Sequence, residues 1–304
     1  MGHITVLGEE AVSGLNLKKD SVVLDCTLGA GGHASRILKI LSAKGQYIGI
    51  DADPTALTQN EHLKETAKAD VTLVNGNFRD IRTILESLNH TTVDAILADL
   101  GWRQEQFNGE TDLPRGFSFK SDEPLFMTYG APTDYAFTAH DIINDWAEED
   151  IANVIYAYGE ERFARRIARL IVQERKTADI ATARELAELV VEAVPAVARR
   201  KRIHPATKTF QALRIAVNDE FDALKDLLNE GFALLKPGGR MAIISFHSLE
   251  DRIVKQTFKT FVHDHTGCLV NKKPLEPTFD EQNQNPRSRS AKLRIIEKQP
   301  YDQS

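Results

Sequence analysis

The 304-residue chain has 42% hydrophobic residues and a net charge of -6, which excludes a disordered chain and argues against a protein coated on all sides by nucleic acid. It shows no charged and then apolar leader, and no apolar run approaches the roughly 20 residues that a membrane span needs. With Cys26 and Cys268 as its two cysteines, the sequence predicts a cytoplasmic protein with free thiols and no disulfide framework.

The first hundred residues alternate short β-branched runs with helical patterns, as parallel sheets with crossover helices do. The spacing predicts four strands, at residues 21–25, 46–51, 71–74 and 93–99, and three of them end in an aspartate. Such strand ends are where open α/β sheets bind ligands. We therefore predict an α/β fold with a doubly wound, mostly parallel sheet whose carboxyl edge holds the functional site.

This alternation stops after about residue 104. A stretch rich in glycine, proline and aromatic residues follows, and then helical patterns at residues 150–176 and 181–194 with no convincing strand. We predict a core domain with an inserted, mainly helical domain that recognises the substrate. The predicted core comprises residues 1–104 and 206–304, and the predicted insertion comprises residues 105–205.

The α/β pattern returns near the end of the chain. A Lys-Pro-Gly-Gly turn at residues 236–239 leads into a predicted strand at 240–246. The sequence SLED at 248–251 then matches a capping box at a helix start. Residues 272–289 carry three of the eleven prolines and predict a surface loop before a last strand at 292–297.

A glycine-rich loop, DCTLGAGGH, begins at Asp25, where the first predicted strand turns into a helix. Glycines there let the backbone approach a ligand. Gly29, Gly31 and Ala34 also fit the dinucleotide fingerprint, with Asp51 about 20 residues further on, so a nicotinamide oxidoreductase is an alternative. Asp25 favours S-adenosylmethionine instead, because a carboxylate repels a pyrophosphate and attracts a sulfonium and an ammonium.

Three further positions suit this cofactor. Asp51 can bind the two ribose hydroxyls, and Phe78, after the third strand, can lie against adenine. Taken alone, Phe78 is more simply explained as a core aromatic. Asp99, at the end of the fourth strand, can orient an amine substrate or hold the methionine end of the cofactor.

Long strings in the sequence match one family. They include TLGAGGH at 27–33, RGFSF at 115–119, HPATKTFQALR at 204–214 and NPRSRSAKLR at 285–294, and they span nearly the whole chain. In these strings the chain resembles the bacterial 16S ribosomal RNA cytosine-N4 methyltransferases (RsmH, also called MraW). The resemblance implies a class I S-adenosylmethionine-dependent methyltransferase fold with a helical insertion. It also implies cofactor contacts at Gly31, Gly32, His33, Asp51, Phe78, Asp99 and Gln106.

The same resemblance implies the substrate, which is the N4 amine of a cytidine in small-subunit RNA within a largely assembled particle. Cytosine N4 is a poor nucleophile because its lone pair is delocalised into the ring, so the enzyme must hold it in line with the methyl donor. We assign catalysis to Asp99 and hypothesise that Trp102 stacks on an extruded cytosine; packing of Trp102 in the insertion's core is an equal alternative. No metal is needed, since the sulfonium already makes a good leaving group.

Two segments depart from the family pattern. After Gly101 the chain has Trp102-Arg103-Gln104 where the family usually has Val-Ser-Ser, and residues 124–130 read PLFMTYG where it usually has PLDMRMD. Both segments are predicted to face the nucleotide. They leave open a second alternative, a cofactor-binding relative with an altered RNA target or low activity that acts in ribosome assembly.

Two stretches without acids, residues 193–218 and 282–296, carry clustered basic residues in an otherwise acidic protein. Such clusters predict contacts with RNA phosphates. The predicted contacts are Arg199, Arg200, Lys201, Arg202, Lys208, Arg287 and Arg289. A homodimer stays open, because the sequence gives no direct sign of one.

Overall fold

The computed structural model describes residues 4–101, 115–199 and 203–300. The chain divides into two compact units, the first made of Met1–Gly101 and Phe221–Ser304 and the second of Trp102–Glu220. Cys26 is buried and Cys268 is exposed, and both are free thiols as predicted. Within the described ranges, no helix is long and apolar enough to cross a membrane.

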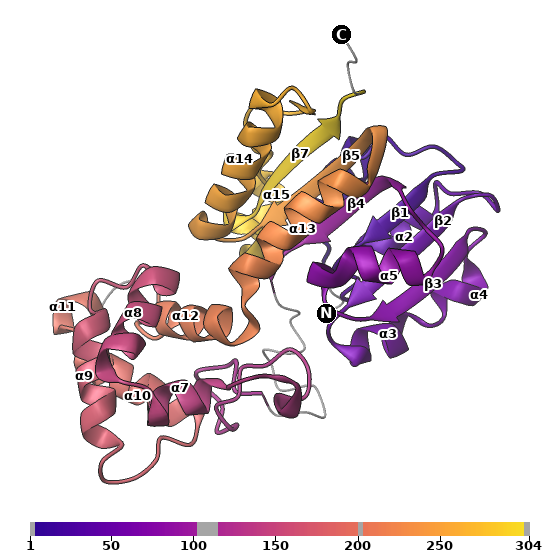
Figure 1. Cartoon of the computed structure of the whole chain (residues 1–304). Helices are drawn as coiled ribbons and strands as arrows, with labels where there is room; N and C mark the ends of the chain where they lie inside the picture. The colour runs from indigo at the N-terminus through magenta and orange to yellow at the C-terminus, as the bar shows by residue number, and fades with distance from the viewer. Residues whose placement is uncertain (1–3, 102–114, 200–202, 301–304) are drawn as a thin grey trace. The chain divides into compact units, whose positions relative to one another are not determined.

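A seven-stranded sheet forms the centre of the first unit, in the order β3-β2-β1-β4-β5-β7-β6 (Figure 1). The pairs from β3 through to β5 are parallel, and β7 pairs antiparallel with both β5 and β6. The predicted doubly wound, mostly parallel sheet is therefore confirmed. Its strands are β1 (Val22–Asp25), β2 (Gln46–Asp51), β3 (Asp70–Asn75), β4 (Val93–Asp99), β5 (Leu235–Ser245), β6 (Gly267–Leu269) and β7 (Lys292–Lys298).

Two strands differ from the sequence prediction by more than one residue at an end. β5 begins at Leu235, before the Lys-Pro-Gly-Gly turn, because Leu235 already pairs with Val93; the register then shifts, and Ala95 pairs with Arg240. The turn is thus an irregularity within the strand and not its start. β6 was not predicted, since a three-residue strand is too short to show a period of two.

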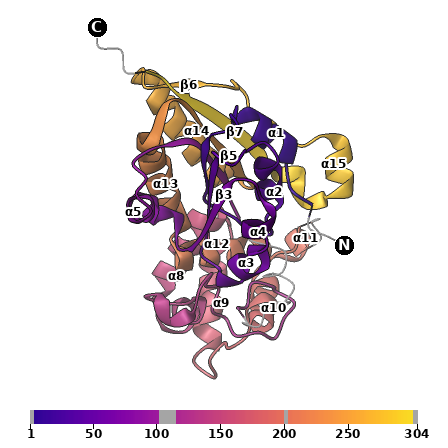
Figure 2. The ribbon, with the colours of Figure 1, turned by 90° about the vertical axis from the view of Figure 1, so that its right-hand side faces the viewer.

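Helices cover both faces of this sheet, as Figure 2 shows. Successive strand residues point to opposite faces, so Val23 and Leu97 pack with α1 and α2, whereas Leu24 and Ile96 pack with α5, α13 and α14. Two apolar layers thereby fix the strands and the loops at their ends. The helices are α1 (Gly8–Gly14), α2 (Gly32–Leu38), α3 (Pro54–Asn60), α4 (Leu63–Thr66), α5 (Ile81–Ser87), α13 (Glu220–Leu234), α14 (Ser248–His263) and α15 (Phe279–Gln284), with the 3-10 turns η1 (Phe78–Asp80) and η3 (Pro286–Ser290).

The surface loop predicted at residues 272–289 is wrong in part, because this segment contains α15 and most of η3. Thr278 caps α15 by accepting a hydrogen bond from the Glu281 N–H at 3.2 Å. The carboxylate of Glu281 accepts another from the Leu7 N–H at 2.9 Å. A contact with the opposite end of the chain leaves no local pattern, so the prolines alone suggested a loop.

The second unit is helical and has an apolar core of its own. Its predicted helical stretch at 150–176 is two helices, because Glu160 takes a left-handed conformation (φ 48°) at the end of the first. Between residues 115 and 220, the described part contains a single isolated β-bridge and no strand. The helices are α7 (Ala139–Asp145), α8 (Glu148–Gly159), α9 (Ala164–Glu174), α10 (Ala183–Ala193), α11 (Ala196–Arg199) and α12 (Thr207–Asn218), with the 3-10 turn η2 (Pro132–Asp134).

Candidate functional site

The carboxyl ends of three neighbouring strands bring acids together at one edge of the sheet. β1 lies between β2 and β4, and all three run parallel, so Asp51, Asp25 and Asp99 end adjacent strands. Glu250, near the start of α14, lies close enough to Asp99 to raise the pKa of that aspartate. This acidic edge favours a cationic ligand over one that carries phosphates.

Asp25 is almost fully buried, at 1% exposure. Its carboxylate accepts hydrogen bonds from the Tyr47 hydroxyl at 2.7 Å and from the Thr27 N–H at 3.1 Å. Burial raises the pKa of Asp25 to about 6, although both hydrogen bonds oppose the shift. Asp25 therefore holds the start of the glycine loop, and its contact with a cofactor stays a prediction.

The raised pKa of Asp25 makes a testable contribution to stability. Between its ordinary pKa of 3.8 and about 6, the folded protein holds more protons at this site than the unfolded chain. The free energy of unfolding should therefore fall as the pH rises through this window and stay level above it, a loss of roughly 3 kcal/mol. Asp25→Asn should remove this component, which urea denaturation across the window would measure.

Tyr47→Phe provides the control for this experiment. The tyrosine hydroxyl stabilises the ionised form of Asp25, so its removal should extend the falling part of the profile to higher pH. Parallel profiles for the wild type and Asp25→Asn would contradict the assignment.

The glycines of the loop leave room for the chain's own side chains. A Cβ at Gly31, where φ is 76°, would lie 1.9 Å from the Asn60 side-chain oxygen, and one at Gly32 would lie 2.0 Å from Thr5 Oγ1. The Asn60 amide also donates a hydrogen bond to the Gly29 carbonyl at 2.9 Å. Sequence reasoning explained these glycines by the approach of a ligand and missed Asn60, which lies far along the chain. The predicted cofactor contacts of Gly31 and Gly32 would use backbone groups, and they stay predictions.

Asp51 and Phe78 follow the two strands on one side of β1: Asp51 ends β2, which pairs with β1, and Phe78 comes after β3, which pairs with β2. The two carboxylate oxygens of Asp51 accept hydrogen bonds from the Gly29 N–H at 2.8 Å and the Asp53 N–H at 2.9 Å. A carboxylate offers about four acceptor sites, so Asp51 could also take ribose hydroxyls. Phe78 begins η1 and is half-buried against the apolar layer that contains α5. Both predicted cofactor contacts remain predictions with suitable positions.

Asp99 and His33 form the centre of the edge. His33 Nε2 lies 3.2 Å from the Val6 carbonyl, which can only accept, so Nε2 carries the hydrogen and Nδ1 faces Asp99 at 3.7 Å. Asp99 itself is fixed by its N–H, which donates to Thr27 Oγ1 at 2.7 Å. Burial, followed by the charges of Asp25 and Glu250, raises the pKa of Asp99 well above its usual value.

One oxygen of Asp99 is an acceptor to which the described chain supplies no donor. Oδ1 is buried and has no hydrogen-bond partner among the described residues. A buried acceptor left in this state costs free energy, so it marks a place where the donor of a ligand fits. The acidic surroundings indicate that this donor is a cation.

Glu250 is a candidate functional residue that sequence reasoning missed. The cap predicted at Ser248 is wrong by one residue, because His247 caps α14 by accepting from the Glu250 N–H at 3.4 Å. The Glu250 carboxylate accepts in turn from the Phe246 N–H at 2.9 Å and is 4% exposed. The box predicted from the sequence used Ser248 and Asp251 and gave Glu250 no role, yet the fold buries the charge of Glu250 near Asp99.

The predicted RNA contacts fall in both units. Arg287 and Arg289 are exposed on η3 of the first unit, and Arg199 and Lys208 are exposed in the second. Arg199 donates to two carbonyls at the end of α10, and Lys208 donates to the Glu160 carbonyl at 2.8 Å. Trp102, Gln106, Arg200, Lys201 and Arg202 lie outside the described residues. All these roles stay predictions.

The second divergent segment, residues 124–130, is largely packed inside the second unit. Met127 and Thr128 are fully buried, at 0% exposure. The neighbouring Tyr129 hydroxyl donates to Glu220 at 2.9 Å. Our expectation that the segment faces a nucleotide is therefore wrong for Met127 and Thr128, because their side chains fill the core of this unit.

Comparisons with known proteins agree over nearly the whole chain. The model of the MraW methylase family matches residues 1–299. Ribosomal RNA small subunit methyltransferase H of Paenibacillus sp. (strain JDR-2) is 47% identical, covering 97% of this chain and 99% of that protein. The protein of the same name from Brevibacillus brevis is 45% identical, covering 97% and 98%. These matches do not favour the nicotinamide oxidoreductase alternative.

A solved rRNA methylase from Streptococcus thermophilus aligns with 98% of this chain and all of that one, at 10% identity and a TM-score of 0.47. The fold assignment rests instead on the sheet itself, in which the strands from β3 to β5 are parallel and β7 is antiparallel. Since the family model and relatives above 40% identity cover almost every residue, the chain belongs to the MraW methylase family.

Proposed function

We propose that this protein transfers the methyl group of S-adenosylmethionine to the N4 amine of a cytidine in 16S ribosomal RNA. Family membership and the names of the relatives support the reaction and the RNA, and the motifs quoted above support the N4 target. The observation that carries the cofactor assignment is the acidic strand edge around Asp99 Oδ1, a buried acceptor with no hydrogen-bond partner in the part of the chain that the structure describes. A cytoplasmic location and a largely assembled particle as substrate belong to the same proposal, and a homodimer stays open.

The residues at the edge fit this cofactor. Asp99 Oδ1 would accept from the ammonium of the methionine end, and Asp51 would accept from the ribose hydroxyls. Phe78 would lie against adenine, and the loop from Gly31 to His33 would supply backbone contacts. When bound, the cofactor supplies an activated methyl group on a cationic sulfur that leaves as a neutral thioether.

The chain's own part in the reaction is positioning and electrostatics. Thr27 holds the end of β4 through the Asp99 N–H, so the carboxylate is placed before any ligand arrives. A cation at Asp99 would favour the ionised carboxylate and lower the raised pKa. Holding the amine in line with the methyl donor would supply much of the rate, and Trp102 stacking on the cytosine belongs to this proposal.

Mass spectrometry of small-subunit RNA tests the proposed function directly. Cells that lack this protein should lose one methyl group from a cytidine of 16S RNA, and a plasmid copy of the wild type should restore it. The purified chain should add the same group to small subunits from those cells. Identical spectra with and without the protein, while calorimetry still detects S-adenosylmethionine binding, would favour the alternative of an assembly factor with little activity.

A further inference from the structure

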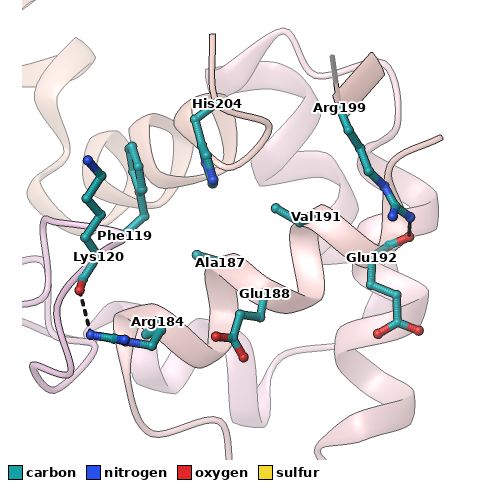
Figure 3. Close-up of a pocket in the computed structure, with 9 residues that line it drawn as sticks. All are labelled: Phe119, Lys120, Arg184, Ala187, Glu188, Val191, Glu192, Arg199 and His204. Carbon is teal, nitrogen blue, oxygen red and sulfur yellow. Dashed lines mark hydrogen bonds between the residues drawn. The ribbon is translucent and has the colours of Figure 1, made fainter. Parts of the chain in front are cut away.

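The second unit contains a pocket of about 470 Å³ that is formed by described residues of this unit alone (Figure 3). One wall is α10, which contributes Ala187 and Val191 as an apolar surface. Phe119 and His204 stand opposite, from segments far apart in the sequence. This volume lies in the range of sites for small ligands. None of these residues belongs to the acidic edge of the sheet described above.

Phe119 and His204 form a stacked aromatic pair at this pocket. Their ring centroids lie 4.4 Å apart with an angle of 4° between the planes. Phe210 meets Phe119 edge-on, at 6.0 Å and 86°, so the phenyl ring is supported by the core. His204 is exposed, and in Figure 3 its ring stands between Phe119 and the α10 side of the pocket. The pair therefore offers a flat, rigid surface to a ligand.

The imidazole of His204 is held in one orientation. Its Nδ1 accepts a hydrogen bond from the Ala206 N–H at 3.2 Å, so the other ring nitrogen carries the hydrogen. The part of the His204 ring that is covered by its neighbours loses contact with water, and this desolvation, followed by the charge of Lys120, lowers the pKa of His204. The ring is therefore uncharged near neutral pH and presents a neutral π face.

Charged groups flank this surface at both ends. Lys120 and Arg184 lie on one side and Arg199 on the other. The two guanidinium groups are fixed, since Arg184 pairs with Asp122 at 2.8 Å and Arg199 donates to two carbonyls at the end of α10. Cations at the ends of an aromatic platform are suited to the phosphates on either side of one stacked base.

Two acids on α10 lie at the edge of the pocket. In Figure 3 the carboxylates of Glu188 and Glu192 point away from the His204 ring, so they leave the space above the ring open and would repel a phosphate only at this edge. They can accept hydrogen bonds from the amino group of a base, as carboxylates accept from cytosine N4. Uracil has no amino group to offer.

We propose that this pocket binds one nucleotide of single-stranded RNA, with an amino-bearing base stacked on His204 and its phosphates toward Lys120 and Arg199. The inference rests on the proposed function, because it gives the RNA substrate a specific contact in the second unit. It adds a base-reading site to the basic residues that the sequence assigned to phosphates alone.

Two substitutions of His204 separate stacking from a structural role. His204→Phe keeps the flat ring and loses the hydrogen bond from Ala206, whereas His204→Asn keeps a side-chain acceptor near Ala206 and loses the ring. The full-length protein is titrated into a short fluorescein-labelled oligocytidylate, and anisotropy gives the affinity. We expect His204→Asn to bind roughly 5- to 100-fold more weakly and His204→Phe to bind close to the wild type.

Two further experiments test whether Lys120 contacts a phosphate and whether the pocket distinguishes between bases. Lys120→Gln should reduce the slope of log affinity against log salt by about 0.7, as expected for one phosphate on a single strand, and His204→Asn should leave that slope unchanged. Oligouridylate should bind more weakly than oligocytidylate, and Glu188→Gln combined with Glu192→Gln should reduce this difference.

Three outcomes would contradict the proposal that this pocket binds a nucleotide. They are equal affinities for His204→Asn and the wild type, equal losses in both His204 variants, or no saturable binding of oligocytidylate by the wild type. Methylation of small subunits by the wild type is measured alongside. If methylation is present while the His204 variants behave alike, the pocket inference fails and the proposed function stands; if methylation is absent, the proposed function fails whatever the oligonucleotide shows.

Discussion

Asp99→Asn should weaken the binding of S-adenosylmethionine by roughly 10- to 100-fold and reduce methyl transfer at least as much. The substitution keeps the shape of the side chain but removes the charge from the buried Oδ1, which lacks a partner among the described residues. A hydrogen bond between charged groups contributes about 1.5–3 kcal/mol, which corresponds to this change in affinity. Isothermal calorimetry would measure the binding, and transfer of a radiolabelled methyl group would measure the activity.

The same residue predicts a pH dependence. The pKa of Asp99 is raised by its burial and by Asp25 and Glu250, and a cation prefers the ionised carboxylate. Cofactor affinity should therefore rise as the pH increases through this raised pKa, with release of a proton on binding, and Asp99→Asn should lose that component.

Asp94→Asn is the matched control, because Asp94 lies at the other end of β4. It pairs with Lys236 at 2.9 Å and accepts from the Val22 N–H at 2.8 Å. Its substitution should leave cofactor affinity unchanged. Equal affinities for Asp99→Asn and the wild type would remove Asp99 from the cofactor site.

Gly31→Ala should destabilise the first unit by roughly 2–5 kcal/mol and abolish measurable cofactor binding. Two costs add at this position. The left-handed backbone, with φ of 76°, costs alanine about 1–2 kcal/mol. The new Cβ would also lie 1.9 Å from the Asn60 side-chain oxygen, and overpacking of this kind costs about 1–3 kcal/mol. Urea denaturation and calorimetry would measure the two effects.

Two other glycines separate these costs. Gly238 has a φ of 79° with nothing within 4 Å of an added Cβ, so Gly238→Ala should show the backbone cost alone. Gly32 lacks a positive φ, but its Cβ would lie 2.0 Å from Thr5 Oγ1, so Gly32→Ala should show the packing cost alone. If Gly31→Ala and Gly238→Ala lose the same stability, Asn60 yields freely and the packing argument is wrong.

Local patterns in the sequence were sufficient for the first four strands of the sheet and for the acids at its edge. β2 and β4 have the predicted bounds, because apolar runs that end in an aspartate are a strong local signal. Neighbouring parallel strands end at the same edge, so the strand pattern alone was enough to place Asp25, Asp51 and Asp99 together. The family motifs added His33, which the fold sets 3.7 Å from Asp99.

The partners of these residues could not be predicted, because they depend on contacts between distant segments. Tyr47 bonds Asp25 from the next strand, and Asn60 reaches the Gly29 carbonyl from the end of α3. Glu250 lies beside Asp99 only because α14 follows the neighbouring strand β5. Nor does any periodicity in the sequence indicate that Phe119 and His204 stack in the second unit.

The insertion of one unit into the other also determines the order in which the fold can be completed. The second unit is a single continuous segment, whereas the first is made of two segments that flank it. On the ribosome, β4 is therefore synthesised before the insertion, and its partner β5 emerges only afterwards. Until then the apolar stretch from Ala95 to Ala98 has an unpaired edge, which is the kind of strand that joins other chains. This edge of β4 thus waits for its partner for as long as the whole insertion takes to be made.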